Sequence, residues 1–305
     1  MLKPFSKKFQ IWAEMIKLEH TIFSAPFMLS AVLLAAYPSW PSLQVLFWCC
    51  VGLLGARSAA MTLNRLIDAR IDAATPRTSQ RAIPAGKFSK QAALISSILG
   101  FGLLLLAALN LPKLCLYLLP LAVFWLSFYS FVKRFSWLCH LVLGIALGGA
   151  VLGGWIGVTG SFDWFPFFMG FGVAFWVCGF DIIYALQDLE FDQKHFLHSI
   201  PAKFGLQKSL ILSQVAHLLS LICFCIGALY LANQLGISSA NEILKSPILI
   251  SYNSGILVLA LGLVRQHIII SKDLARINEV FFTANAWIST LFFACILLGK
   301  IASQI

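Results

Sequence analysis

The chain has 305 residues, of which 60% are apolar and 11% are charged, whereas a soluble domain has about a quarter charged residues. A water-soluble surface of this size cannot be built from so few polar side chains. The same composition excludes a disordered chain, which is poor in hydrophobic residues. An integral membrane protein remains.

Continuous apolar runs of about 20 residues, the length that crosses a bilayer as a helix, recur along the whole chain. They do not alternate with polar residues as the strands of a membrane barrel do. The sequence therefore predicts nine transmembrane helices, at residues 22–38, 43–64, 91–109, 112–131, 138–159, 164–187, 208–231, 247–264 and 280–300. No linker or soluble domain interrupts them, so residues 1–305 are predicted to form a single all-α membrane domain. The N-terminus lacks a signal-peptide cleavage pattern and is expected to be retained.

Positive charge is distributed unevenly across this predicted topology. Eighteen Lys and Arg residues fall in the N-terminal segment and in the loops after the second, fourth, sixth and eighth helices, and three fall on the opposite side. Such a bias places the N-terminus and these loops in the cytoplasm. Anionic lipid headgroups attract the same residues, so the net charge of +10 indicates a lipid bilayer and no nucleic acid partner.

The Cys and His residues predict no zinc site. All eight Cys lie in apolar spans without a CxxC pair, which is typical of small buried hydrophobic residues. His195 and His198 form an HxxH pair in a predicted loop, where ligation would need further ligands. His140 and His217 are interpreted as packed polar residues.

Six of the twelve Asp and Glu residues cluster where two predicted helices leave the membrane on the cytoplasmic side. The first cluster follows the second helix, and the other follows the sixth; they comprise Asp68 and Asp72, then Asp181, Asp188, Glu190 and Asp192. Carboxylates near membrane depth are costly and usually functional.

Each cluster contains two Asp residues four positions apart, which places both on one helical face. Asn64 and Arg57 extend the first stripe towards the membrane interior. Tyr184 and Asp181 extend the second stripe in the same way. Like charges at this spacing destabilise a helix, so two facing pairs require a counter-ion. Mg²⁺ is the candidate, because it takes one or two carboxylates together with substrate phosphate oxygens.

Basic residues of the predicted loops lie on the same side of the membrane as the acidic pairs: Arg77, Arg81, Lys133, Arg134 and Lys203. Taken alone, one acidic pair is typical of a solvated helix end, and basic loops are typical topology signals. Two equally spaced pairs beside basic loops instead favour a site for a Mg²⁺-bound diphosphate, because metal and Arg or Lys share its charge. Gly148, Gly149, Gly153 and Gly154 are predicted to permit close helix packing rather than to bind phosphate.

These motifs resemble those of the UbiA superfamily of intramembrane aromatic prenyltransferases over essentially the whole chain. The family pattern NDxxDxxxD corresponds to residues 64–72, with Arg65 in place of the first Asp. An RxxxRPxPxG-like element follows at Arg77, Arg81, Pro84 and Gly86, with Ala82 where many members have Pro. The YxxxKR element matches Tyr129, Lys133 and Arg134, and DxxYAxxDxxxD matches residues 181–192 at every spacing.

The resemblance implies a bundle of about nine transmembrane helices around a lipid-accessible apolar chamber, in the cell (inner) membrane. It implies Mg²⁺-dependent transfer of a polyprenyl group from polyprenyl diphosphate to an aromatic acid. The implied metal ligands are Asn64, Asp68, Asp72, Asp188 and Asp192. Asp181 and Tyr184 would join the Asp residues in catalysis, Tyr184 through its ring. Arg77, Arg81, Lys133, Arg134 and Lys203 would bind the diphosphate, and Arg57 would bind the acceptor's carboxylate.

Several alternatives remain open on the sequence alone. The acceptor is expected to be of the 4-hydroxybenzoate type used in ubiquinone synthesis. The segment KLEHTIFSAPF and the Asn64-Arg65 pair also resemble members that serve menaquinone synthesis through futalosine, with a naphthoate-type acceptor. Arg57 could instead be an interhelical hydrogen-bond anchor. An ion-coupled transporter would place its acids nearer mid-membrane on broken helices, and a purely structural membrane protein would leave the paired carboxylates without a role.

Overall fold

The computed structural model describes residues 7–17 and 21–305, and this part of the chain is helical with no β-strand. Its first half contains α1 (Lys7–Met15), α2 (Thr21–Ala35), α3 (Leu43–Ile67), α4 (Ala69–Ala74), α5 (Lys90–Asn110), α6 (Lys113–Val132) and α7 (Cys139–Thr159). Its second half contains α8 (Trp164–Ala185), η2 (Leu186–Asp188), α9 (Leu189–Lys194), α10 (Ile200–Gln234), α11 (Ala240–Ile243), α12 (Pro247–Lys272), η3 (Leu274–Arg276), α13 (Ile277–Glu279), η4 (Val280–Ala284) and α14 (Asn285–Ala302).

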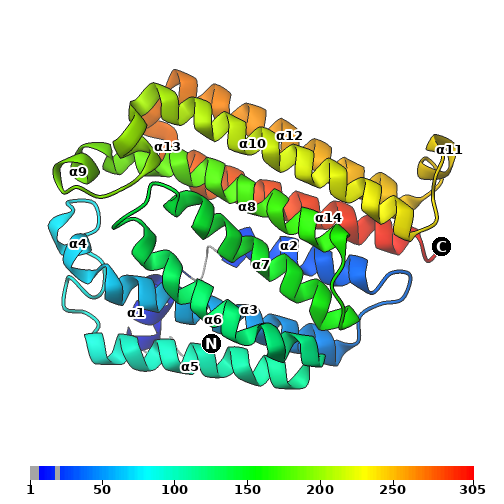
Figure 1. The fold of residues 1–305 in the computed structure, drawn as a ribbon, viewed down its shortest axis with the longest axis horizontal. Coiled ribbons are helices and arrows are strands. Elements are labelled where there is room, and N and C mark those ends of the chain that lie inside the picture. Colours follow the sequence, from blue (N-terminus) through cyan, green and yellow to red (C-terminus); the bar gives the residue numbers. More distant parts are fainter. Residues whose placement is uncertain (1–6, 18–20) are drawn as a thin grey trace, which may run out of the picture.

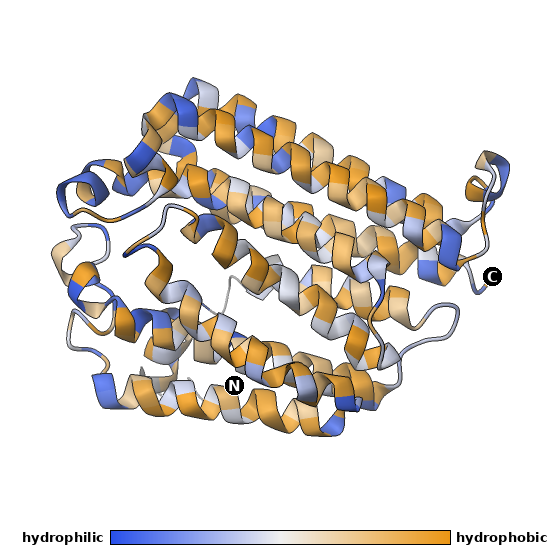
Figure 2. Cartoon of the chain, viewed as in Figure 1, coloured by the Kyte–Doolittle hydropathy of each residue, from blue (hydrophilic) through white to orange (hydrophobic). Residues whose placement is uncertain are grey.

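The long helices lie side by side along the length of the molecule (Figure 1). Eight of the described helical segments are long and apolar enough to cross a membrane, and the apolar part of α2, Ser24–Ala35, adds a shorter ninth. Hydrophobic residues run along these helices, whereas hydrophilic residues gather at the two ends of the bundle (Figure 2). The prediction of an all-α bundle of about nine spans is confirmed.

The bundle core forms around α2. Phe27 is fully buried, and its ring lies 5.1 Å from that of Trp176 on α8 and 5.0 Å from that of Phe292 on α14, centroid to centroid. Aromatic pairs prefer such tilted or edge-to-face arrangements. The first span is therefore held by helices from the second half of the chain.

Glycines of α7 serve two different purposes. A Cβ on Gly148 would collide with the backbone carbonyl oxygen of Gly170, and one on Gly154 would lie 3.0 Å from the carbonyl oxygen of Met28. These two glycines let helices approach closely. A Cβ on Gly149 or Gly153 would meet nothing within 4 Å, so the prediction of close packing is confirmed for Gly148 and Gly154 and wrong for the other two.

Two predicted helix ends differ from the observed ones by more than the others, each by about two turns. The span expected at 247–264 continues as α12 to Lys272, because its polar residues find partners inside the bundle. Gln266 is fully buried and donates from Nε2 to Asn285 Oδ1 at 2.7 Å. The span expected at 208–231 begins at Ile200 and has a break at Gly205, where φ is +75°; this left-handed conformation favours glycine.

Candidate active site

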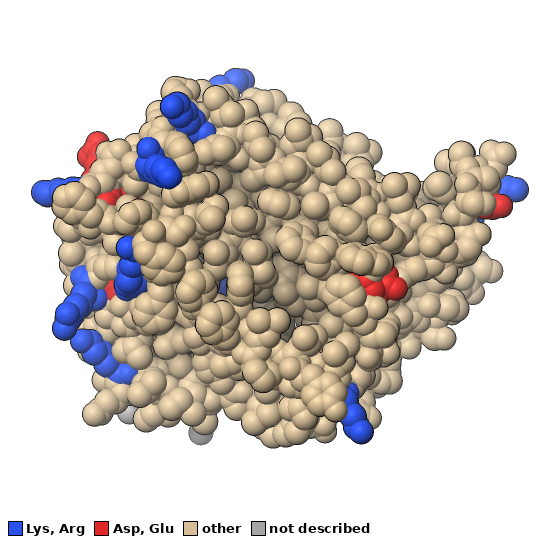
Figure 3. All heavy atoms as spheres, viewed as in Figure 1, with Lys and Arg blue, Asp and Glu red and all other residues tan. Residues whose placement is uncertain are grey.

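Residues 64–72, the first acidic motif, and residues 181–192, the second acidic motif, reach the same end of the bundle. Their short helices α4 and α9 lie near each other there, opposite the end that carries α11 and the C-terminus (Figure 1). We call this end the acidic end, because both acidic motifs lie there. Lys and Arg side chains gather on its surface, with Asp and Glu among them (Figure 3). The expected meeting of the two motifs is therefore observed.

The two motifs share a local design that is not visible in the sequence. Asp68 lies between α3 and α4 with φ −85° and ψ 2°, and Asp188 is the last residue of η2, directly before α9, with φ −106° and ψ 8°. Both are in the bridge region of backbone conformation, where many active-site residues are found. A six-residue helix follows each break, carrying Asp72 in one case and Asp192 in the other. In each motif, the first Asp therefore lies at a helix break and the second lies on the short helix that follows, so the two carboxylates do not share one straight helix.

Asp68 is 6% exposed and is paired with a basic side chain. Arg134 donates from Nη2 to Oδ1 of Asp68 at 2.8 Å, and Asn64 donates from Nδ2 to Oδ2 at 3.0 Å. The Arg134 guanidinium also donates to the carbonyl oxygens of Ser130 and Ile67, at 2.7 and 3.1 Å. These bonds hold the charge of Arg134 beside the first motif.

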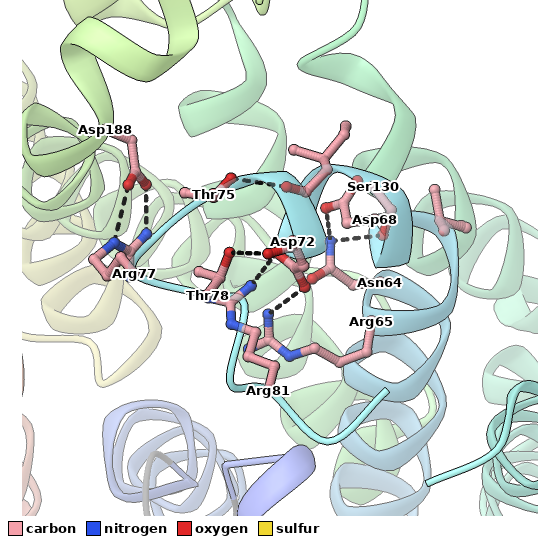
Figure 4. Close-up of polar contacts among 12 residues, drawn as sticks. Asn64, Arg65, Asp68, Asp72, Thr75, Arg77, Thr78, Arg81, Ser130 and Asp188 are labelled. Carbon is pink, nitrogen blue, oxygen red and sulfur yellow. Dashed lines mark hydrogen bonds and ion pairs between the residues drawn. The ribbon is translucent and has the colours of Figure 1, made fainter. Parts of the chain in front are cut away.

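Asp72 is 4% exposed and lies between two guanidinium groups (Figure 4). Arg81 Nη1 donates to its Oδ1 at 2.6 Å, and Arg65 Nη1 lies 4.0 Å from its Oδ2. Oδ2 is buried and accepts no hydrogen bond from the part of the chain that the structure describes. A buried carboxylate oxygen without a donor is costly, so this atom is available to a cation.

Arg77, in the loop after α4, joins the two motifs. Its Nε donates to Oδ1 of Asp188 at 2.9 Å, its Nη2 donates to Oδ2, and its Nη1 donates to the hydroxyl of Tyr184 at 2.8 Å. Figure 4 shows this paired contact with Asp188. Burial lowers the pKa of Arg77, but the hydrogen bonds and charge interactions with Asp188 and Tyr184 together outweigh burial, so the pKa is raised overall and the side chain stays charged.

Asp192 and Asp181 complete the second motif. Asp192 is 6% exposed; it accepts a hydrogen bond from the Ser199 hydroxyl and interacts with the charge of Lys133. Asp181, two turns before Asp188, bonds through Oδ2 to Nδ1 of His140 at 2.7 Å. Four of the five predicted Asp residues are therefore paired with Arg or His, and Asp192 is hydrogen-bonded to Ser199.

The donor set of the two motifs suits Mg²⁺. Asn64 and four of the Asp residues offer only oxygen ligands to a hard cation, and Asp72 Oδ2 accepts no hydrogen bond from the described residues. Within residues 7–17 and 21–305, no three His, Cys, Asp or Glu side chains are close enough to form a metal cage by themselves. Mg²⁺ in substrate complexes needs no such cage, because substrate phosphates and water complete its coordination.

Two predicted site residues lie away from the carboxylates. Lys203, in the first turn of α10, places its Nζ 4.7 Å from the ring centroid of Trp137, a cation–π contact. Arg57 lies on α3, two turns deeper than Asn64, and donates from Nη2 to the carbonyl oxygen of Lys17 at 2.7 Å. Its buried Nε has no hydrogen-bond partner among the described residues, so part of the guanidinium remains available.

Three residues of the site were not predicted. Arg65 faces Asp72 with a side chain that is 11% exposed, although the sequence showed it only as a departure from the family pattern. His140 bonds to Asp181 rather than simply packing. Phe281 of the π-helical segment η4 stacks on Tyr184 with ring centroids 4.0 Å apart. Only the position of Arg65 within the first motif could have signalled its place.

An apolar cavity of about 530 Å³ lies between α3, α5, α6 and α7. None of the described residues that line it is charged; Gly149 and Gly153 face it, and Ala56 lines it next to Arg57. Leu118, Leu121 and Phe162 line it and are also exposed on the outside of the bundle. The cavity therefore opens sideways, where lipid would surround a membrane-spanning bundle, and matches the predicted chamber.

The HxxH pair does not form a metal site with other described residues. His195 stacks on Phe191, with ring centroids 3.9 Å apart, and its Nδ1 lies 3.0 Å from the carbonyl oxygen of the same residue. The backbone N–H of His198 donates to the carbonyl oxygen of Lys133. All eight Cys are free thiols.

Comparison with known proteins gives consistent matches. The sequence profile of the UbiA prenyltransferase family matches residues 24–296. A 4-hydroxybenzoate octaprenyltransferase from Vibrio campbellii is 32% identical over 59% of this chain and 63% of its own length. A 4-hydroxybenzoate solanesyltransferase from Synechocystis is 35% identical over 57% of this chain and 60% of its own. The matched region thus spans about three-fifths of these curated relatives.

Solved structures match over nearly the whole chain. The apo structure of a UbiA homolog from Aeropyrum pernix is 30% identical, with a TM-score of 0.76, over 94% of this chain and 98% of its own. A UbiA homolog from Archaeoglobus fulgidus, bound to GPP and Mg²⁺, has a TM-score of 0.68 at 17% identity, over 94% and 99% of the two chains. The second match concerns the fold alone.

Proposed function

Because the chain belongs to the UbiA prenyltransferase family, we propose that it transfers a polyprenyl group from polyprenyl diphosphate to an aromatic acid in quinone biosynthesis. The observation that carries this proposal is the meeting of two acidic motifs and three arginines at one end of a bundle that also contains an apolar cavity. The names of the curated relatives support an acceptor of the 4-hydroxybenzoate type.

Asn64, Asp68, Asp72, Asp188 and Asp192 are the proposed ligands of Mg²⁺. When bound, the metal would supply neutralisation of the diphosphate charge. The structure of the Archaeoglobus fulgidus homolog, which is bound to GPP and Mg²⁺, supports this choice of metal. Oδ2 of Asp72, which has no hydrogen bond, is the first candidate ligand atom.

The basic side chains would bind the departing diphosphate. Arg77, Arg81 and Arg134 now donate to Asp188, Asp72 and Asp68. Arginine binds phosphate oxygens with the same paired geometry that it uses for carboxylates. We expect these guanidinium groups to exchange carboxylate for diphosphate oxygens when substrate binds, so that the negative charge formed on the leaving group is stabilised. Lys133 and, more remotely, Lys203 would add positive charge.

The apolar cavity would hold the prenyl chain and exclude water from the allylic carbon. Its lining has no charged side chain, and a site without water protects an allylic cation from hydrolysis. Tyr184 would face this cation. Its position is fixed by the hydrogen bond from Arg77 to its hydroxyl and by the stacking of its ring on Phe281. The lateral opening would let a long chain extend into the bilayer.

The acceptor would lie deeper than the diphosphate. Arg57 is two turns below Asn64 on α3, and Asp181 is two turns below Asp188 on α8. We propose that Arg57 binds the carboxylate of the acid and that Asp181 accepts the proton released in the reaction. The allylic C–O bond breaks with its electron pair on the diphosphate, a ring carbon beside the hydroxyl forms the new C–C bond, and that carbon loses its proton.

The proposed orientation follows the distribution of charge. Many helices of the bundle are apolar and of membrane-spanning length, and the basic residues gather at the acidic end (Figure 3). The positive-inside rule favours a cytoplasmic location for that end. We propose the cell (inner) membrane, with the N-terminus and the active-site loops in the cytoplasm.

The purified chain in lipid nanodiscs would be incubated with a matrix of aromatic acids and polyprenyl diphosphates in the presence of Mg²⁺. The matrix includes 4-hydroxybenzoate and a naphthoate acid, and the products are identified by mass. We expect a prenylated 4-hydroxybenzoate. Prenylation of the naphthoate acid alone would replace the acceptor, and no product from any pair would overturn the proposal.

A further inference from the structure

His140 occupies a buried position beside the second acidic motif. It lies in the first turn of α7 and is 3% exposed. Its Nδ1 lies 2.7 Å from Oδ2 of Asp181 on α8, and its Nε2 accepts the backbone N–H of Ile200, at the start of α10, at 3.3 Å. One imidazole of α7 therefore bonds to two further helices, α8 and α10, at the acidic end.

These two contacts fix the protonation state of the ring. A backbone N–H can only donate, so Nε2 of His140 must present a lone pair to Ile200. A neutral imidazole that accepts at Nε2 carries its proton on Nδ1. Nδ1–H then donates to Oδ2 of Asp181. His140 is therefore a neutral hydrogen-bond bridge between the backbone of α10 and Asp181.

The other oxygen of Asp181 is left open. Oδ1 accepts no hydrogen bond from any described residue, and the side chain is 20% exposed. Asp181 precedes Tyr184 by three residues, so both lie on one face of α8. The hydroxyl of Tyr184 accepts from Arg77 on that face. The open oxygen thus belongs to the side of α8 that carries the site.

We propose that His140 is a positioning residue that fixes Asp181, through Nδ1–H, so that the open carboxylate oxygen accepts the proton released by the aromatic acceptor. This inference rests on the proposed prenyl transfer. His140 itself neither gains nor loses a proton in the reaction. Residues that orient a functional group in this way typically contribute about 10-fold to 100-fold.

Two substitutions at His140 separate positioning from simple packing. His140→Gln offers an amide N–H to Asp181 and an amide oxygen to Ile200, and it cannot become an imidazolium. His140→Leu fills similar space but makes neither bond. We expect His140→Gln to keep kcat within about threefold of wild type, and His140→Leu to lower kcat about 10-fold to 100-fold. The KM for prenyl diphosphate should change less than twofold in either variant, as a measure that the diphosphate site is intact.

A double variant tests whether His140 acts through Asp181. Asp181→Asn should lower kcat by about 100-fold or more. If His140 works only through that carboxylate, adding His140→Leu to Asp181→Asn costs little more, because effects on one functional unit are not additive. A further 10-fold loss in the double variant would assign His140 a separate structural role and overturn the inference.

Nitrogen NMR on the wild-type protein gives a readout that does not depend on activity. With ¹⁵N-labelled histidine, the His140 signals are assigned by their loss in His140→Gln. We expect Nδ1 protonated and Nε2 unprotonated; a proton on Nε2 would overturn the inference even if His140→Leu fails to fold. A His140→Gln variant that folds but loses more than 10-fold in kcat would do the same. Absence of transfer by the wild type would instead contradict the proposed function.

Discussion

Arg77 donates to both carboxylate oxygens of Asp188, so one side chain ties the loop after the first acidic motif to the second acidic motif, 111 residues later in the chain. The same guanidinium donates to Tyr184. Paired hydrogen bonds between Arg and a carboxylate are among the strongest in proteins. The two motifs therefore form one polar site, and a bound diphosphate would have to compete with Asp188 for Arg77.

Asp68→Asn and Asp188→Asn are expected to abolish prenyl transfer, with kcat/KM reduced by about 100-fold or more. Each substitution removes charge from a proposed Mg²⁺ ligand and keeps the size of the side chain. Steady-state kinetics in nanodiscs would measure the loss. Glu190→Gln, which neutralises an exposed carboxylate in the same short helix as Asp192, is the matched control and should retain normal kinetics. Near-normal turnover of either Asp variant would contradict the paired metal site.

Arg77→Ala is expected to raise the KM for prenyl diphosphate by about 10-fold or more, because a charge-assisted hydrogen bond is worth about 1.5–3 kcal/mol. Arg70→Ala removes an exposed arginine of the neighbouring helix α4 and serves as the control. The KM for the aromatic acid should stay within about twofold. An equal effect of the two substitutions would show that Arg77 acts only through general positive charge.

Arg57→Ala is expected to raise the KM for the aromatic acid by about 10-fold to 100-fold, because the carboxylate of the acid would lose the guanidinium that binds it. The KM for prenyl diphosphate in the same variant is the internal control and should hardly change. If both constants rise together, Arg57 is an interhelical anchor for the carbonyl of Lys17, and the acceptor's carboxylate binds elsewhere.

Gly149→Leu is expected to reduce the use of long prenyl diphosphates more than short ones. A Cβ at this position enters open space that belongs to the apolar cavity, and overfilling a packed site costs about 1–3 kcal/mol. Gly102→Leu on α5 is the control for effects on the helix itself. A Cβ at Gly102 also meets nothing within 4 Å, but Gly102 does not line this cavity. Competition between short and long diphosphates measures the shift; an unchanged ratio would place the prenyl chain outside this cavity.

The two ends of the bundle are expected on opposite sides of the membrane. In a cysteine-free background, Glu190→Cys at the acidic end and Lys245→Cys at the other end would be labelled with a membrane-impermeant maleimide. Labelling of position 245 in intact cells, with position 190 labelled only after permeabilisation, is the expected result. The reverse pattern would invert the proposed orientation.

Much of this architecture could be predicted from the sequence because its signals are local and repetitive. Apolar runs indicated the spans, and equal four-residue spacing indicated the paired carboxylates. The helix breaks at Asp68 and Asp188 could not be predicted, since neither motif contains Gly or Pro near the break. The breaks depend on tertiary partners such as Arg134 and Arg77, which are distant in the chain.

Polar residues within spans led to two kinds of wrong prediction: a helix that was expected to end too early, and a hydrogen-bonded His that was interpreted as a packing residue. The polar run at residues 265–267 resembled a loop. In the structure, Gln266 bonds to Asn285, and Nε2 of His267 lies 2.8 Å from Nδ1 of His217. Hydrogen bonding inside the bundle lets the helix continue through such residues. His140 was interpreted as a packing residue for the same reason: its partner Asp181 lies on another helix, which no spacing rule reveals.

The most direct test of the central claim is the stoichiometry of diphosphate release by the purified protein in nanodiscs, with and without Mg²⁺. With 4-hydroxybenzoate, a polyprenyl diphosphate and Mg²⁺ present, the protein should release one diphosphate for each prenylated acid that it forms. Chelation of the metal should stop both together. Diphosphate release without prenylated product, or product formation that is unaffected by chelation, would contradict a metal-dependent transferase built from Asp68, Asp72, Asp188 and Asp192.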